Sequence, residues 1–472
     1  MRPTTHAVVL GGGLAGTLAA AALARHVDEV TVVERDVMPD GPEPRRGVPQ
    51  ARHSHLLWCG GARAIEALLP GTTEALLAAG AHRVGLPSGL VLLTAHGWMP
   101  RWPETHFMIS SSRDLLDSTV RRQVLGRPGV TLRQGVRAVG PVGTAERITG
   151  VRVRDERSGE TFVLEADFVV DATGRASRAD RWLAGLGLPA VREETVDSGL
   201  AYATRVFRAP PAAGKDFPVI TLQADPRDGQ PGRGAALLPI EGDRWLVTLS
   251  GTRGGEPPTD EERFHAFARG LRSPVVAELI EDAEPLTPVH GSHGTANRRR
   301  YFERLDPWPD GFAVLGDAVA AYNPVYGQGM SVLAHGAVLL DRILGRHGLR
   351  PGTARRVQRA VAGPVDGAWQ TAVGQDVQFP DVAGPSPSAV DRLLLRYLDR
   401  LVRTATSRPA AAEAFLEAIT LSGPMTRLVG PKALLTTLLG PRRPAPAAPT
   451  LTADERSRAR GAGATPEVPD TV

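Results

Sequence analysis

A short stretch in the C-terminal half has the residue types of a ligand site. It reads LGDAVAAYNPVYGQGMS and runs from residue 315 to residue 331. The apolar run before it predicts a strand that ends at Gly316 and Asp317, which places the Asp317 carboxylate at the carboxyl edge of a sheet, where ligands collect in open α/β folds. A carboxylate there can accept hydrogen bonds from ligand hydroxyl groups. Pro324, Gly327 and Gly329 then predict a loop of free N–H groups at the start of a helix.

A glycine-rich turn near the N-terminus provides a second element of this kind. In HAVVLGGGLAGTLAAAALARHVDEVTVVERD, a strand at 7–10 precedes Gly11-x-Gly13-x-x-Gly16, an alanine-rich helix and a second strand at 30–33. The first glycine permits a tight turn, the second lets the backbone approach a pyrophosphate, and the third allows close helix–strand packing. Glu34, 18 residues after the last glycine, can accept hydrogen bonds from a ribose. These features predict dinucleotide binding and leave FAD and NAD(P) both open.

A third element lies between these two. The stretch TFVLEADFVVDATGRASR, residues 161–178, contains a buried strand that stops at Asp171-Ala172-Thr173-Gly174. Taken alone, it is better explained by a strand that ends in a turn. The alternating pattern upstream, over 150–170, predicts a meander of the kind that interrupts the nucleotide fold of many flavoproteins.

Taken together and in this order, the three motifs resemble the signature of FAD-dependent monooxygenases of the para-hydroxybenzoate hydroxylase type, over residues 6–345. The resemblance implies an α/β (α+β) fold: a Rossmann-like FAD-binding domain of the glutathione-reductase type with an inserted antiparallel β-sheet substrate domain. Ala320 stands where this family often has a histidine, which puts in doubt any role of that histidine in phenol chemistry.

A closer resemblance connects the chain to the FAD-dependent epoxidases of polyether ionophore biosynthesis, which oxidise the polyene precursors of monensin and lasalocid. The stretches that carry it are RRGVPQARHSHLLWCGGARAIEALLPG, SSRDLLD, FRAP, SGTRGGEPP and GDAVAAYNPVYGQGMS. It implies transfer of oxygen from a flavin C4a-hydroperoxide to several alkenes of a linear, apolar polyketide polyene, free or carrier-bound, with O2 and NADPH or NADH as co-substrates. The cofactor supplies the reactive oxygen, so we predict no catalytic side chain.

The resemblance also assigns residues to the cofactor. Arg46 and Gln50 would lie against the flavin and its phosphates, and the backbone of Val136 against the adenine. Arg113 would bind the adenosine or the pyrophosphate, although an ordinary exposed arginine at a helix start explains it equally well. The full set of predicted cofactor-binding residues is Gly11, Gly13, Leu14, Ala15, Gly16, Glu34, Arg35, Arg46, Gln50, Arg113, Val136, Asp171, Thr173, Gly174, Asp317, Pro324, Gly327, Gln328, Gly329 and Met330.

Four stretches between the second and third motifs alternate as strands: GLAYATRVFRAP, FPVITLQAD, GAALLPIEG and DRWLVTLSGT. We predict that they form a sheet over the flavin whose inner face lines the substrate tunnel. The candidate lining residues are Trp98, Tyr202, Thr204, Leu237, Pro239 and Thr248.

These elements predict a division of the chain into four parts. The FAD-binding domain would comprise 1–85, 105–190 and 300–345, and the substrate-binding sheet 86–104 and 191–299. Helical patterns follow over 346–440. The Pro- and Ala-rich segment 441–472 predicts an extended, mobile tail with one short helix.

Other enzyme classes fit the motifs less well. Flavin-dependent halogenases need a lysine in the tunnel, and no lysine precedes Lys215. An aromatic-ring hydroxylase remains open because flavin motifs do not specify the substrate, as does a non-redox flavin-binding protein. His53 and His55 lack a third ligand at suitable spacing, so we predict no metal.

Composition excludes several further classes. The chain has 472 residues, 42% hydrophobic and 22% charged, with a net charge of +4, which requires neither nucleic acid nor an anionic membrane as partner. The single cysteine, Cys59, excludes an internal disulfide and fits a reducing compartment. The apolar N-terminus resembles a signal peptide, but the strand pattern continues beyond it. We therefore expect a cytoplasmic protein without a membrane span.

Overall fold

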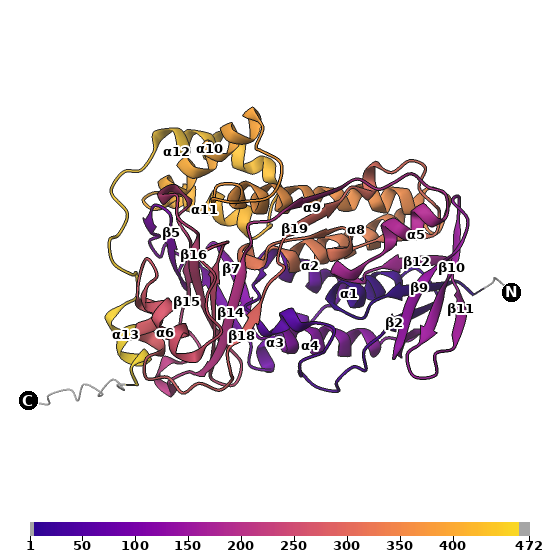
Figure 1. The fold of residues 1–472 in the computed structure, drawn as a ribbon, viewed down its shortest axis with the longest axis horizontal. Coiled ribbons are helices and arrows are strands. Elements are labelled where there is room, and N and C mark those ends of the chain that lie inside the picture. The colour runs from indigo at the N-terminus through magenta and orange to yellow at the C-terminus, as the bar shows by residue number, and fades with distance from the viewer. Residues whose placement is uncertain (1–3, 462–472) are drawn as a thin grey trace, which may run out of the picture.

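A five-stranded parallel sheet organises the N-terminal part of the computed structural model, which describes residues 4–461 (Figure 1). Its strands, in spatial order, are β20 (Phe312–Val314), β12 (Phe168–Asp171), β1 (His6–Leu10), β2 (Glu29–Glu34) and β8 (Val130–Gln134). Strands β1 and β12 are buried along nearly their whole length, which explains their continuous apolar sequence.

Helices and small sheets surround this parallel sheet. The meander β9 (Val136–Gly143), β10 (Ile148–Asp155) and β11 (Thr161–Glu165) forms a sheet of its own, as predicted for a flavoprotein nucleotide fold. Two further three-stranded sheets are β3 (Leu57–Trp58), β7 (His106–Ser110) and β4 (His82–Leu86), and β13 (Glu193–Val196), β19 (Asn297–Arg300) and β21 (Ala320–Ala321). The helices of this region are α1 (Leu14–Leu23), α2 (Cys59–Leu68), α3 (Thr72–Ala78), α4 (Arg113–Leu125), α5 (Ala179–Gly185), α8 (Gly329–His347) and α9 (Thr353–Asp376).

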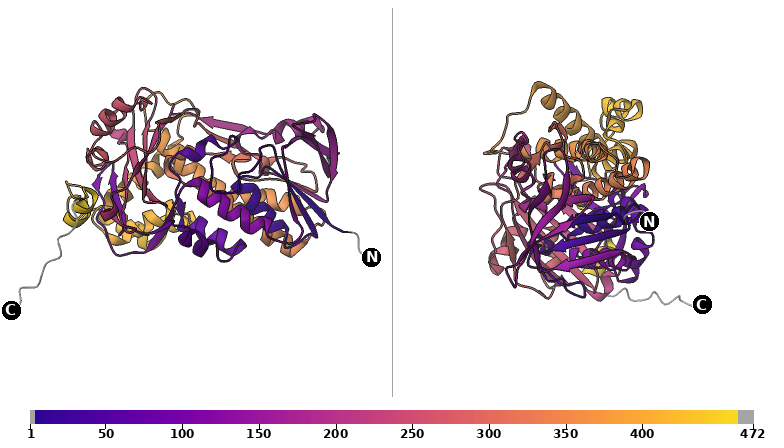
Figure 2. Two further views of the ribbon diagram at one scale, coloured as in Figure 1. Left: turned by 90° about the horizontal axis from the view of Figure 1, so that it is seen from below. Right: turned by 90° about the vertical axis from the view of Figure 1, so that its right-hand side faces the viewer.

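A seven-stranded mixed sheet forms the other end of an elongated molecule (Figures 1 and 2). All four predicted strands are present, and the spatial order is β18 (His290–Ser292), β14 (Ala201–Arg208), β17 (Arg244–Gly251), β16 (Arg233–Ile240), β15 (Val219–Leu222), β5 (Leu90–Thr94) and β6 (Gly97–Trp98). Only the pair β15–β5 is parallel within this sheet.

The two faces of the seven-stranded sheet are covered by different helices. Helices α6 (Glu261–Arg269) and α7 (Val275–Ile280) pack on the outer face, in a cluster with Leu237 and Trp245. Helices α10 (Ala389–Ala405) and α11 (Pro409–Ile419) pack on the inner face, in a cluster with Leu238 and Leu246. Helix α12 (Pro431–Leu439) lies outside α10 and α11 (Figure 1).

The segment after α12 differs from the extended, mobile tail that we predicted. Both carboxylate oxygens of Glu455 accept hydrogen bonds from Arg101 at 2.7 Å, and Leu451 packs into the outer-face cluster. One short helix is present, α13 (Ala453–Ala459). Residues 441–461 are therefore docked on the sheet, and the rest of the predicted tail, 462–472, lies outside the described residues.

Within residues 4–461, no helix has the length and apolarity needed to cross a membrane.

Candidate active site

The three predicted motifs meet at the carboxyl ends of the parallel strands. The N–H of Ala172 donates to the carbonyl of Leu10 at 2.9 Å, and the N–H of Leu315 donates to the carbonyl of Asp171 at 2.9 Å. Gly11 has φ +96°, and a Cβ there would lie 2.6 Å from the Ala172 carbonyl oxygen. The close approach of these turns therefore depends on a glycine at position 11.

Two helices begin at this edge with open glycines. Gly13 precedes α1, and no side chain within residues 4–461 caps that helix. A Cβ added at Gly13 would lie 3.8 Å from Nη2 of Arg45 and would meet no other described atom within 4 Å. Gly329 begins α8, and a Cβ there would meet nothing within 4 Å. Both helix starts thus leave N–H groups and space for an anion or a polar ring edge. Gly16 serves packing instead, because its Cβ would overlap the Gly11 carbonyl.

Glu34 lies at the end of β2, as predicted, and is already engaged with the glycine-rich turn. Its Oε2 accepts a hydrogen bond from the N–H of Gly12 at 2.8 Å and lies 3.5 Å from Nη1 of Arg45. Arg45 is buried, whereas the predicted Arg46 and Gln50 are exposed. The arginine beside the glycine-rich turn is therefore Arg45, which no sequence motif indicated, and contacts of Arg46 and Gln50 with the flavin stay a prediction.

Asp171 organises its turn and does not face the site. It is fully buried, and its carboxylate accepts hydrogen bonds from the N–H and hydroxyl of Thr173 and from the hydroxyl of Ser177, at 2.6–2.9 Å. Burial raises the pKa of Asp171 despite these hydrogen bonds. We predict a cofactor contact for Asp171, and in this structure its carboxylate is engaged within its own turn by these three hydrogen bonds. Gly174, with φ +70°, turns the chain toward Asp317.

The Asp317 carboxylate is free to bind a ligand. It is half-buried and accepts no hydrogen bond from any side chain or backbone group between residues 4 and 461. Burial raises its pKa, and the charges of Arg175, Arg113 and Arg298 act in the opposite direction. The charges of three arginines from separate segments thus act on the Asp317 carboxylate.

The loop before α8 combines open backbone with anchored side chains. Gly327 has φ +63° and packs against Leu56, and Pro324 starts the turn before it. The side chain of Gln328, one of the predicted cofactor-binding residues, donates to the carbonyls of Ala418 and Ile419 at 3.3 and 3.1 Å. Its side chain therefore ties the loop to α11. Met330 is buried in the core behind the loop.

A buried carboxylate that sequence reasoning missed holds this loop from behind. Asp376, at the end of α9, accepts hydrogen bonds from Asn323, Asn297, Ser198 and Tyr326 at 2.7–3.1 Å. Burial raises the pKa of Asp376, and the donated hydrogen bonds oppose that effect. No motif marks this residue, because its donors lie far from it in sequence, the most distant 178 residues away.

The remaining predicted cofactor residues differ in their burial and in their contacts. Arg113 is largely buried, and its Nε donates to Asp117 at 2.7 Å, so it is not an ordinary exposed arginine. Arg35 is half exposed beside Asp36. Val136 is buried at the start of β9. Leu14 and Ala15 belong to the first turn of α1, where Ala15 packs against Gly316.

Uncharged polar groups gather where the seven-stranded sheet faces the loop 53–55. Nδ1 of His53 and Oγ1 of Thr204 share a hydrogen bond of 2.8 Å, and the hydroxyls of Thr204 and Thr248 are hydrogen-bonded at 2.7 Å. Ser54 donates its N–H to Thr248 at 3.1 Å. Burial, with smaller effects from His290 and Arg52, lowers the pKa of His53 to about 4, so the imidazole is neutral at physiological pH.

Half of the predicted substrate residues lie on the other face of this sheet. Tyr202, Thr204 and Thr248 are on the inner face, but Leu237 and Trp98 belong to the outer cluster with α6 and α7. Pro239 is paired with Trp245 and shares that outer face. The strands alternate as predicted, but on β16 the residues that we assigned to the inner face, Leu237 and Pro239, lie on the outer face.

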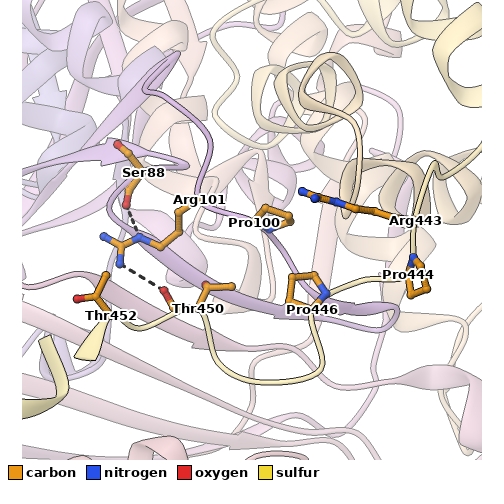
Figure 3. Close-up of a pocket in the computed structure, with 8 residues that line it drawn as sticks. All are labelled: Ser88, Pro100, Arg101, Arg443, Pro444, Pro446, Thr450 and Thr452. Atoms are coloured by element: carbon orange, nitrogen blue, oxygen red, sulfur yellow. Dashed lines mark hydrogen bonds between the residues drawn. The ribbon is translucent and has the colours of Figure 1, made fainter. Parts of the chain in front are cut away.

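A cleft of about 660 Å³ lies elsewhere, between the docked C-terminal segment and the loop before β7 (Figure 3). The guanidinium of Arg101 is held there by Ser88, Thr450 and Glu455. None of the predicted cofactor residues lines this cleft, whose walls are Ser88, Pro100, Arg101, Arg443, Pro444, Pro446, Thr450 and Thr452.

The carboxyl edge of the parallel sheet fits FAD. The two open helix starts at Gly13 and Gly329 offer N–H groups at separate points, and the unpaired Asp317 carboxylate can accept from a polyhydroxyl chain. Residues 7–212 match the family of FAD dependent oxidoreductases. The chain is also 31% identical to Protein Rv3254 of Mycobacterium tuberculosis over 431 residues, which cover 89% of this chain and 90% of that protein.

The chain belongs to the FAD-dependent oxidoreductases. This flavoenzyme is also 29% identical to a kynurenine 3-monooxygenase of Salinispora tropica, over 83% of its own length and 84% of that protein. Its fold is similar to that of the flavin-dependent brominase Bmp2, with a TM-score of 0.62 and 15% identity, over 88% and 94% of the two chains.

The predicted α/β class, the FAD cofactor and the enzyme class, an FAD-dependent monooxygenase, are confirmed. NAD(P)H and O2 are the co-substrates typical of that class. The likeness to a brominase concerns the fold alone, and both lysines of the flavoenzyme, Lys215 and Lys432, are exposed.

Proposed function

We propose that this flavoenzyme is an epoxidase that transfers oxygen to alkenes of a linear, apolar polyketide polyene, with several epoxidations per substrate, in polyether antibiotic biosynthesis. The sequence stretches shared with polyether epoxidases support this proposal. FAD, reduced by NAD(P)H, supplies the oxygen-transfer chemistry when bound.

The uncharged character of the inner sheet face is the observation that carries the proposal. At the centre of that face, the side chains of Tyr202, Thr204 and Thr248 are neutral, and Leu238 and Leu246 beside them are packed under α10 and α11. A charged amino acid or a phenolate would leave its charge unpaired there, at a high desolvation cost. An isolated alkene needs no charged partner.

The protein's own contribution is positioning and exclusion of water. Neutral His53 is fixed by Thr204, so its ring presents a hydrogen-bonding nitrogen in constant orientation. Tyr202 is anchored to Asn323 by a hydrogen bond of 3.2 Å, and both are buried.

An aromatic-ring hydroxylase is the second candidate, because a relative at 29% identity is named a kynurenine 3-monooxygenase. Ala320 weakens this candidate, since it is buried in β21 and brings no titratable side chain to the site.

Product analysis distinguishes the two functions. The FAD-loaded enzyme would be supplied with NADPH, O2 and, in separate reactions, a linear polyene acid, a phenol and kynurenine. The proposal predicts mass increments of one oxygen atom per alkene with the polyene and no oxygenated product from either aromatic compound. Hydroxylation of an aromatic ring without alkene oxidation would contradict it.

A further inference from the structure

Helix α12 turns its apolar face outward. Leu434, Leu435, Leu438 and Leu439 are exposed by 37, 62, 67 and 60%, and we call them the outward leucines. The buried face of the same helix contains the small residues Ala433 and Thr437. A surface helix normally packs its large apolar residues on the core, so this arrangement is the reverse of the usual one.

Neighbouring elements expose further apolar side chains. Val429, just before α12, is 50% exposed, and Leu393 and Val390 on α10 are 67 and 74% exposed. The side chain of Arg400 on α10 donates to two carbonyls near the end of α12, which fixes the two helices together. Figure 1 shows α10 and α12 side by side in the outermost layer of the molecule.

The same helices carry an excess of positive charge. Arg392, Arg396 and Arg403 recur at intervals of four and seven residues and share one exposed face of α10. Among residues 4–461, Arg396 and Arg403 have no acidic partner. The segment 389–443 contains nine Lys and Arg against four Asp and Glu, so its net charge of +5 exceeds the +4 of the whole chain.

We propose that this surface binds anionic lipid bilayers, with the outward leucines inserted at the boundary between head groups and acyl chains and the α10 arginines on lipid phosphates. The inference goes beyond the proposed reaction and does not depend on it. A symmetric contact between two copies would place the same positive surface against itself. The exposed large apolar residues here are all Val and Leu, whereas protein contacts are centred on Trp and Tyr.

Vesicle flotation tests the proposal. The full-length, FAD-loaded enzyme would be mixed with vesicles of phosphatidylcholine alone or of phosphatidylcholine with phosphatidylglycerol. We expect flotation with the anionic vesicles only, decreasing with added salt. The variant Leu435→Glu/Leu438→Glu should bind anionic vesicles at least about tenfold more weakly. The control Leu77→Glu, an exposed leucine on α3, should bind like the wild type.

Flavin absorbance and NADPH oxidation measured in solution should be unchanged in all three proteins, which excludes misfolding. The proposal is overturned if the wild type does not float with anionic vesicles, or if the α12 variant floats as the wild type does. It is equally overturned if size-exclusion chromatography shows a dimer that the α12 substitutions dissociate while vesicles bind neither protein.

Discussion

The hydroxyl of Tyr202, on β14 of the seven-stranded sheet, donates a hydrogen bond of 3.2 Å to Oδ1 of Asn323, just before the loop that begins α8. Asn323 in turn donates to Asp376 at 3.0 Å. The sheet that we assign to the substrate and the loop that we assign to the flavin are therefore joined through one buried network. This connection fixes the position of the sheet relative to the loop.

Removal of the carboxylate at the centre of this network should release the loop. In Asp376→Ala, the donors Asn323, Asn297 and Tyr326 lose their acceptor in a buried position. We expect a loss of about 3 kcal/mol in the free energy of unfolding and weaker FAD retention. Chemical denaturation and flavin fluorescence measure both. The control Asp282→Ala, at an exposed site, should change neither; equal loss in both variants would refute the role of the network.

Two of the glycines of α8, Gly329 and Gly336, should respond differently to an added methyl group. In Gly329→Ala, the added Cβ meets no protein atom within 4 Å, so it would project into the space that we assign to the cofactor. We expect an apoprotein of undiminished Tm with FAD affinity reduced about tenfold. Gly336→Ala, inside the helix, should raise stability by about 0.5–1 kcal/mol and leave FAD binding unchanged. Unaltered FAD affinity in Gly329→Ala would show that the cofactor does not approach this helix start.

Adjacent arginines provide a direct comparison near α1. Arg45→Ala should raise the dissociation constant of FAD about tenfold, because the buried guanidinium lies beside Glu34 and the open Gly13. Arg46→Ala should have little effect, since Arg46 is exposed. Titration of apoprotein with FAD, followed by fluorescence quenching, measures both constants. Equal dissociation constants of FAD for the two variants would show that Arg45 does not contact the cofactor.

His53 should make stability depend on pH in the acid range. Burial holds its pKa at about 4, against 6.5 for a free histidine, so the unfolded chain binds this proton first. The stabilising contribution of neutral His53 is complete above pH 6.5 and is lost as the pH falls toward 4. Compared with His53→Gln, the wild type should lose on the order of 3 kcal/mol over that window. Parallel stability profiles for the two proteins would contradict a buried neutral imidazole.

The backbone motifs could be predicted from sequence because few residues satisfy their geometry. Gly11 and Gly16 are imposed by contacts of 2.6 and 1.8 Å that any Cβ would make, and Asp317 follows a strand whose end is marked by Gly316. These constraints act on residues close together in sequence, so they can be predicted from one amino-acid sequence.

Side-chain directions depended on distant partners and were harder to predict. Leu237 faces outward because α6 and α7 cover that side, a fact that the alternation of β16 does not contain. Asp171 points inward to Thr173 and Ser177, and Gln328 reaches α11, some 90 residues away. The docking of residues 441–461 likewise depends on the ion pair between Arg101 and Glu455, and no local sequence pattern predicts a contact between such distant residues.

A crystal structure of the FAD-loaded enzyme tests the central claim most directly. We predict that the pyrophosphate lies at the start of α1 beside Gly13, the ribityl chain beside Asp317, and the isoalloxazine between Gly329 and the inner face at Thr204. Density for the flavin in any other place, such as the cleft beside Arg101 and Arg443, would contradict the account, as would a purified protein that remains colourless after addition of FAD.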